Sequence, residues 1–185
     1  MVFLVLATAG TARAGDLSTE LKIGGLAHDV NPRFVNDEPS LFGNHVEEDS
    51  LDVNFEALFP PFRPLFGGTL RPAIGATVNT VGATSHAYAD VRWQYETPSG
   101  IFFALGVGAA VHDGNLGPED PDRRALGTRV LFHIPVEVGL RFDEHNSVSL
   151  YWEHTSNAGL PFLFDIGEEY NPGMDRIGVR YGYRF

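Results

Sequence analysis

The last nine residues of the chain alternate strictly between two kinds of side chain. Apolar or aromatic residues occupy every second position, with glycine or arginine between them: Ile177, Val179, Tyr181, Tyr183 and Phe185. A β-strand points successive side chains to opposite faces, so one face is apolar and the other carries glycine and arginine. This pattern predicts a strand between lipid and a polar lumen, as in a transmembrane β-barrel. A half-buried strand of a soluble β-sandwich would show the same alternation.

Seven further segments show the same period of two. They cover residues 16–28, 49–59, 69–80, 85–96, 100–112, 127–142 and 146–156. The segment 100–112 is apolar on both faces but carries only alanine and glycine at four positions of one of them, which suits a narrow barrel interior. With the final strand, the pattern predicts an all-β fold, an eight-stranded antiparallel transmembrane barrel.

The lengths of the connections fit such a barrel. Those after the first, fifth and seventh segments are roughly fifteen to twenty residues long, and those after the second, fourth and sixth are shorter. Outer-membrane barrels have short periplasmic turns and longer outer loops. Only the connection after the third segment, residues 81–84, is short where a long one is expected. Because side chains fill a barrel of eight strands, solute transport is disfavoured.

The ends of the chain and its charge suggest an exported protein. Residues 1–14 form an apolar run that closes on Ala12-Arg13-Ala14, which predicts a signal peptide followed by a barrel over residues 15–185. The chain lacks cysteine, which removes any disulfide framework and any thiolate chemistry. Its formal charge of −11 makes nucleic acid an improbable partner.

Two polar residues interrupt the apolar face of the seventh segment. His154 and Ser156 are two positions apart and share the face of Trp152, where unpaired polar groups facing lipid are costly. Asp175 has the outward parity of Ile177 on the next strand, so it can approach His154 across the hairpin. A serine, a base and a carboxylate predict an activated nucleophile. Alternatively, His154 and Ser156 are ordinary residues at the entrance of a loop.

A family resemblance favours the catalytic interpretation. The run His-Thr-Ser-Asn-Ala-Gly at 154–159, followed by Asn-Pro-Gly-Met-Asp at 171–175 and a terminal aromatic strand, resembles the PagL family of outer-membrane lipid A 3-O-deacylases. The segment 71–75, leading to Asn79-Thr80 and Tyr88, is also similar to that family. The resemblance implies an eight-stranded barrel whose Ser-His-acid triad hydrolyses the ester of the 3-hydroxyacyl chain at position 3 of lipid A.

The resemblance assigns roles to individual residues. Ser156 matches the nucleophile and His154 matches the base. Asn157 and Gly159 match the positions whose backbone amides would bind the oxyanion of the tetrahedral intermediate.

The acid is where this sequence departs from the family. The family pattern has a glutamate after a shorter connection, whereas Asp175 occupies that place here and residues 160–170 look extended. Glu168 or Glu169 could serve instead if the loop folds back. Asp175 is preferred because it alone lies on the strand with outward parity.

The expected partner is lipopolysaccharide in the outer leaflet of the bacterial outer membrane, with no cofactor and no metal. The pairs His28-Asp29 and His112-Asp113 are interpreted as solvated loop residues rather than metal ligands. Arg123 and Arg124, in the loop after the fifth segment, are candidates for contact with a lipid A phosphate. A homodimer is left open.

Two other functions remain compatible with the sequence. One is a small non-catalytic barrel that acts as a structural or adhesive surface protein through its outer loops. The other keeps the esterase chemistry but acts on glycerophospholipid of the outer leaflet.

Overall fold

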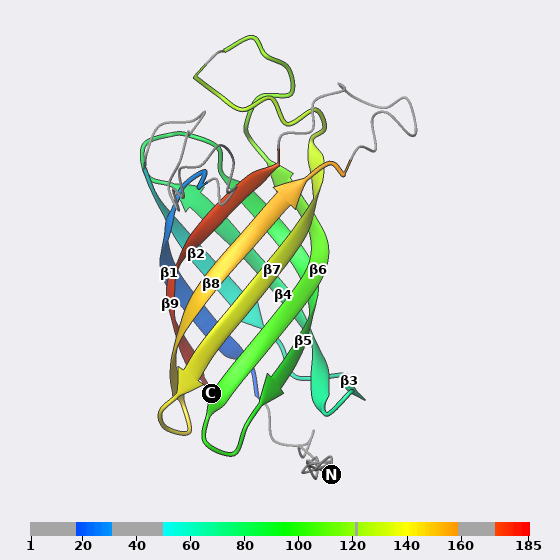
Figure 1. The fold of residues 1–185 in the computed structure, drawn as a ribbon, viewed down its shortest axis with the longest axis vertical. Coiled ribbons are helices and arrows are strands. Elements are labelled where there is room, and N and C mark those ends of the chain that lie inside the picture. The colour runs from blue at the N-terminus through cyan, green and yellow to red at the C-terminus, as the bar shows by residue number, and fades with distance from the viewer. Residues whose placement is uncertain (1–17, 31–49, 121, 159–172) are drawn as a thin grey trace, which may run out of the picture.

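The computed structural model describes residues 18–30, 50–120, 122–158 and 173–185, which form a closed antiparallel barrel (Figure 1). Its strands are β1 (Glu20–Ala27), β2 (Leu51–Leu58), β3 (Arg63–Leu65), β4 (Gly68–Asn79), β5 (His86–Glu96), β6 (Ile101–His112), β7 (Val130–Arg141), β8 (Asn146–Ser156) and β9 (Met174–Arg184). Eight of them form the wall, and pairing of β2 with β4 closes the ring. The predicted all-β, eight-stranded antiparallel barrel is confirmed.

The described residues contain no helix that is long and apolar enough to cross a membrane.

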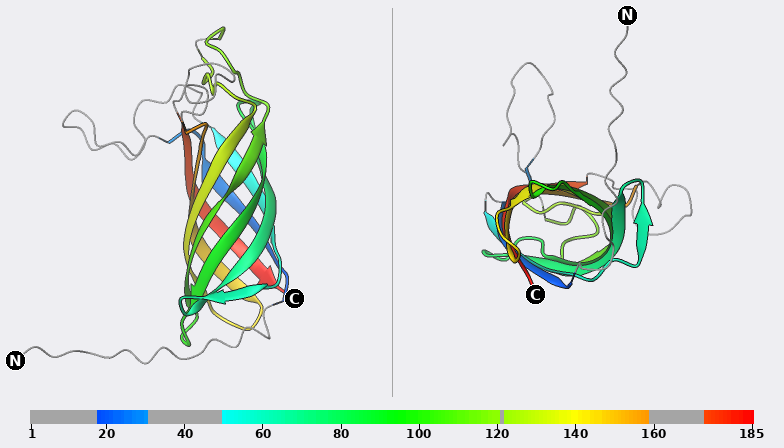
Figure 2. Two further views of the ribbon diagram at one scale, coloured as in Figure 1. Left: turned by 90° about the vertical axis from the view of Figure 1, so that its right-hand side faces the viewer. Right: turned by 90° about the horizontal axis from the view of Figure 1, so that it is seen from below.

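A ninth, short strand was not expected from the sequence. β3 lies in what was predicted to be a plain connection, pairs with the start of β4, and flanks the wall on the outside (Figure 2). Phe66 and Gly67 between the two strands both have positive φ, 46° and 78°, as in a type I′ hairpin turn. The usual sequence signal for a type I′ turn is Asn-Gly or Asp-Gly. Here phenylalanine occupies the first of the two central positions, so the sequence does not indicate the turn. The Trp93 ring Nε1 donates to the carbonyl of Leu65 at 2.8 Å and ties the hairpin to the wall.

The two faces of the wall differ as the alternation predicts. Apolar side chains on the outside are exposed, Leu150 at 63% and Val179 at 56%. Inside, four of the largest fully buried side chains are arginines: Arg71, Arg92, Arg176 and Arg180. Carboxylates such as Glu137 pair with them, so charged side chains fill the lumen.

The two ends of the barrel carry different connections. Short turns at residues 97–100 and 142–145 lie at the end where the chain terminates, here called the periplasmic end (Figure 1). Strands β1, β4, β6 and β8 end at the opposite, outer end. In one short turn the side-chain amide of Asn146 and the backbone amides of Asn146 and His145 donate to the Asp143 carboxylate, which lowers the pKa of Asp143. These bonds satisfy donors that the tight turn leaves outside the sheet.

Several sequence expectations fall outside the described residues. These are the signal peptide at 1–14, the alternative acids Glu168 and Glu169, and the oxyanion residue Gly159.

Candidate active site

A histidine and an aspartate face each other across the β8–β9 hairpin on the outside of the barrel. His154 and Asp175 are direct partners in the strand register. Nδ1 of His154 lies 2.9 Å from Oδ1 of Asp175. Both side chains are partly exposed, 29% and 18%, at the outer end where β8 ends and β9 begins. The carboxylate therefore fixes the orientation of the ring and leaves Nε2 for another partner.

Ser156 is the last residue of β8 and lies on the same outward face as His154. Two residues along a strand are separated by about 6.6 Å between their Cα atoms, so a serine hydroxyl at this position is within side-chain reach of Nε2. Within the described part of the chain, no hydrogen bond joins the Ser156 hydroxyl to the ring. Such contacts are often long in a free enzyme and tighten when substrate binds.

Apolar side chains surround this group. Trp152 stacks beside His154, with ring centroids 6.0 Å apart and planes 19° apart. The register places Ile134 opposite His154 and Phe132 opposite Ser156 on β7, and Ile177 opposite Trp152 on β9. The polar trio thus lies in a wall that suits acyl chains, at the level where the strands give way to the outer loops.

The residues after Ser156 turn away from the sheet. The Asn157 side chain is buried, and its amide donates to the carbonyl of Leu126 at 3.2 Å. Ala158 has a φ of 52°, a left-handed conformation that costs roughly 1–2 kcal/mol for a residue with a Cβ. A reversal of this kind beside a candidate nucleophile can direct backbone amides toward one point. Gly159, the second expected oxyanion residue, lies outside the described residues.

Gly173 packs against the edge of the His154 ring, a role that the sequence analysis missed. A Cβ built on Gly173 would lie 2.7 Å from Cε1 and 3.3 Å from Nε2 of His154, and its φ is 38°. A Cβ so close forces the ring or the backbone to move. The available signal was a glycine just before the last strand, which alone does not reveal its neighbour.

We expect Gly173→Ala to reduce turnover by about 10²-fold, because the added methyl group displaces the ring that positions the proton acceptor. The matched control is Gly82→Ala. Gly82 also has a positive φ, 89°, but a Cβ there would meet nothing within 4 Å. The effect is measured as the turnover rate of the refolded proteins. Equal losses of turnover in both variants would show that backbone strain, and not displacement of His154, causes the loss.

Other residues singled out by the sequence have separate partners. Arg124 Nε contacts Asp29 Oδ1 at 2.5 Å, and Arg123 Nη1 donates to the carbonyl of Gly82 at 2.6 Å. His28 Nδ1 lies 2.8 Å from Asp52 inside the lumen, and His112 Nε2 lies 2.7 Å from the carbonyl of Thr128. His28, Asp29 and His112 are buried, so the expectation that they are solvated is wrong for these three. Closure of the barrel turns His28 and His112 inward.

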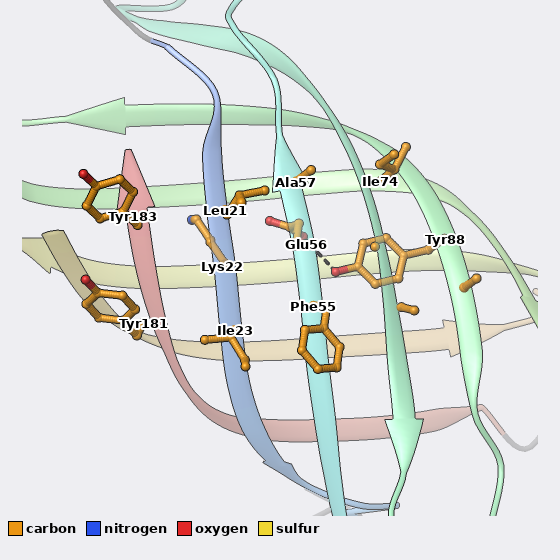
Figure 3. A pocket seen from close by; sticks show the side chains of 13 residues that line it. Leu21, Lys22, Ile23, Phe55, Glu56, Ala57, Ile74, Tyr88, Tyr181 and Tyr183 are labelled. Carbon is orange, nitrogen blue, oxygen red and sulfur yellow. Dashed lines mark hydrogen bonds between the residues drawn. The ribbon is translucent and has the colours of Figure 1, made fainter. Parts of the chain in front are cut away.

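A groove of about 750 Å³ runs over a different part of the outer wall (Figure 3). Its lining includes the small residues Ala57, Gly75, Ala76 and Ala87 and larger apolar side chains such as Ile23. It spans β1, β2, β4 and β5 and reaches β9 at Tyr181 and Tyr183, six or more residues from Asp175 toward the periplasmic end. At about 3.3 Å per residue that separation is roughly 20 Å, so we do not assign the groove to the site around His154.

Comparison with known proteins identifies relatives of this barrel. The chain is similar to a crystal structure of the outer membrane enzyme PagL, with 18% identity and a TM-score of 0.59 over 87% of this chain and 97% of that one. It also resembles the N-terminal β-barrel domain of Pseudomonas aeruginosa OprF, with 11% identity and a TM-score of 0.53 over 91% and 99% of the two chains. These likenesses concern the fold.

Sequence comparisons are more specific. No curated protein sequence matches the chain. The family model described as lipid A 3-O-deacylase (PagL) matches residues 51–184, which include His154, Ser156 and Asp175. The chain therefore belongs to the PagL family of lipid A 3-O-deacylases.

Proposed function

We propose that this protein is a serine esterase that removes the 3-O-linked 3-hydroxyacyl chain from lipid A. It is an outer-membrane protein, as members of its family are. The observation that carries the proposal is the hydrogen bond between His154 and Asp175 on the lipid-facing wall, with Ser156 two strand positions from His154 on the same face. A buried lumen packed with ion pairs offers no comparable access to a lipid.

The geometry supports a two-step acyl transfer. The Ser156 hydroxyl oxygen attacks the acyl carbonyl carbon while Nε2 of His154 takes the hydroxyl proton. Asp175 accepts a hydrogen bond from Nδ1 and stabilises the imidazolium. The ester C–O bond then breaks, and His154 returns the proton to the sugar oxygen.

Water completes the cycle. It gives a proton to His154, attacks the acyl-serine, and releases the 3-hydroxy fatty acid with the serine restored. In both steps the backbone amides of Asn157 and Gly159 stabilise the oxyanion, a role worth about 3–4 kcal/mol per donor in other hydrolases.

Lipid A mass spectra test the proposal. Cells that produce the protein are expected to contain lipid A lighter by one 3-hydroxyacyl residue than cells that lack it. The purified protein, offered lipid A and glycerophospholipid separately in mixed micelles, is expected to release fatty acid only from lipid A. Release from phospholipid alone would favour the phospholipid esterase, and release from neither would favour a non-catalytic surface barrel.

The identity of the acid is tested separately. We expect Asp175→Asn to lower turnover by about 10²–10⁴-fold while the barrel still folds, because an amide cannot stabilise the imidazolium or hold its tautomer. Glu168→Gln and Glu169→Gln serve as matched controls and are expected to retain activity. A large loss in either glutamate variant with an active Asp175→Asn would assign the acid to the loop.

A further inference from the structure

Three potential metal ligands meet inside the lumen, behind the wall that carries the candidate active site. His86 begins β5, His133 lies near the start of β7, and Glu153 lies near the end of β8. All three are at the outer end of the barrel and buried, with His86 5% exposed and the others fully covered. Glu153 precedes His154 in sequence but points to the opposite face.

The distances between donor atoms fit one small ion. Nε2 of His133 lies 3.1 Å from Oε2 of Glu153, and Nε2 of His86 lies 3.4 Å from Oε1 of the same carboxylate. One ligand atom from each residue lies within 4.8 Å of the other two. A tetrahedral ion with bonds of about 2.0–2.1 Å separates its ligands by roughly 3.3 Å. The two histidine–carboxylate separations, each to a different oxygen of Glu153, are already close to that length.

Several of these atoms have no hydrogen-bond partner. Both ring nitrogens of His86 and Oε1 of Glu153 are buried without one. Buried polar groups without a hydrogen-bond partner are destabilising, and two of these atoms, Nε2 of His86 and Oε1 of Glu153, lie 3.4 Å apart with no hydrogen bond between them. A cation among them would accept their lone pairs.

A second carboxylate supports the same interpretation. Nδ1 of His133 lies 3.0 Å from both oxygens of Asp90, which is also buried. Metal-binding histidines commonly donate their second nitrogen to a carboxylate, which fixes the tautomer and turns the lone pair of Nε2 toward the metal. Asp90 is in turn held by Arg92.

We propose that His86, His133 and Glu153 bind a divalent transition-metal ion of the zinc class, with water in the remaining position. Two imidazoles and one carboxylate are typical ligands for such ions. The ion links β5, β7 and β8 inside the lumen and on the far side of the wall from Ser156, so its role is to stabilise the outer end of the barrel. No metal was expected from the sequence.

Two charged neighbours define the competing arrangement. Arg176 Nη1 lies 3.9 Å from Oε1 of Glu153, and a protonated His133 could bridge Asp90 and Glu153 without any ion. In that arrangement no metal binds, and His86 keeps its 3.4 Å approach to Oε1 of Glu153. A measurement of metal binding distinguishes the metal-bound arrangement from the metal-free one.

The experiment uses the full barrel, without a polyhistidine tag, refolded in detergent with either Zn²⁺ or Co²⁺ and then dialysed. We expect about one equivalent of metal per chain, visible d–d bands of low-coordinate Co²⁺, and a higher Tm than in protein refolded with chelator. His86→Gln is the main variant, because neither ring nitrogen of His86 makes a hydrogen bond that the change would remove. We expect it to bind at least about tenfold more weakly and to lose the rise in Tm.

His145→Gln is the matched control, since His145 lies in a periplasmic turn and bonds the carbonyl of Arg184. It is expected to bind metal like the wild type. Heat-modifiable migration in gels confirms that each variant has folded. Absence of a stoichiometric metal in the folded wild type, or equal binding by His86→Gln, would overturn the proposal whether or not the protein is an esterase.

Discussion

Replacing Ser156 with alanine is expected to lower release of 3-hydroxy fatty acid from lipid A by about 10⁴-fold or more, because the nucleophile of a serine hydrolase has no substitute. Loss of the hydroxyl leaves the His154–Asp175 hydrogen bond in place, so substrate binding and the fold are expected to persist. The measurement is single-turnover hydrolysis by refolded protein in mixed micelles. Mass spectra of lipid A from cells that produce the variant give an independent measurement.

Ser99→Ala is the appropriate control for that variant. Ser99 lies in the exposed turn between β5 and β6 and contacts Thr97. Its removal is expected to leave activity unchanged. Lipid A of identical acylation in cells that produce the wild type or Ser156→Ala would contradict the assignment of the nucleophile.

The part of the site built by one hairpin could be predicted from the sequence. His154 and Asp175 belong to strands that follow each other along the chain, and strand parity alone decides that both face outward. Their hydrogen bond follows from the hairpin register, which the structure pairs as expected. Local alternation was enough here because one loop separates the two strands.

The contacts inside the lumen were harder to predict, because they join strands that are far apart in the chain. Glu56, Glu137 and Arg180 come from β2, β7 and β9, and they meet only because the sheet closes into a ring. Alternation shows that each faces the lumen, but the shear that sets which residues share a level is not a local property. Gly173 was missed similarly, since its function depends on the ring that packs against it and not on its own position.

The second large prediction concerns the stability of the ion pairs in the lumen. Arg180 is fully buried, donates to Glu137 at 2.6 Å, lies 3.2 Å from Glu56, and stacks over the Tyr151 ring at 3.6 Å. We expect Arg180→Met to lower the free energy of unfolding by about 3–5 kcal/mol, because it leaves carboxylates buried with fewer cations to balance them. Urea titration of the folded barrel in lipid vesicles, followed by tryptophan fluorescence, measures the change.

Two further variants separate charge from packing. Arg63→Met, on the exposed strand β3, is expected to change stability by less than about 0.5 kcal/mol. Arg180→Met combined with Glu137→Gln is expected to recover at least about 1 kcal/mol, since the second change removes the carboxylate that lost its closest partner. If the double variant were no more stable than Arg180→Met alone, lost packing against Tyr151 rather than uncompensated charge would explain the destabilisation. The lumen would then resemble an ordinary close-packed core, in which the volume of Arg180 matters more than its charge.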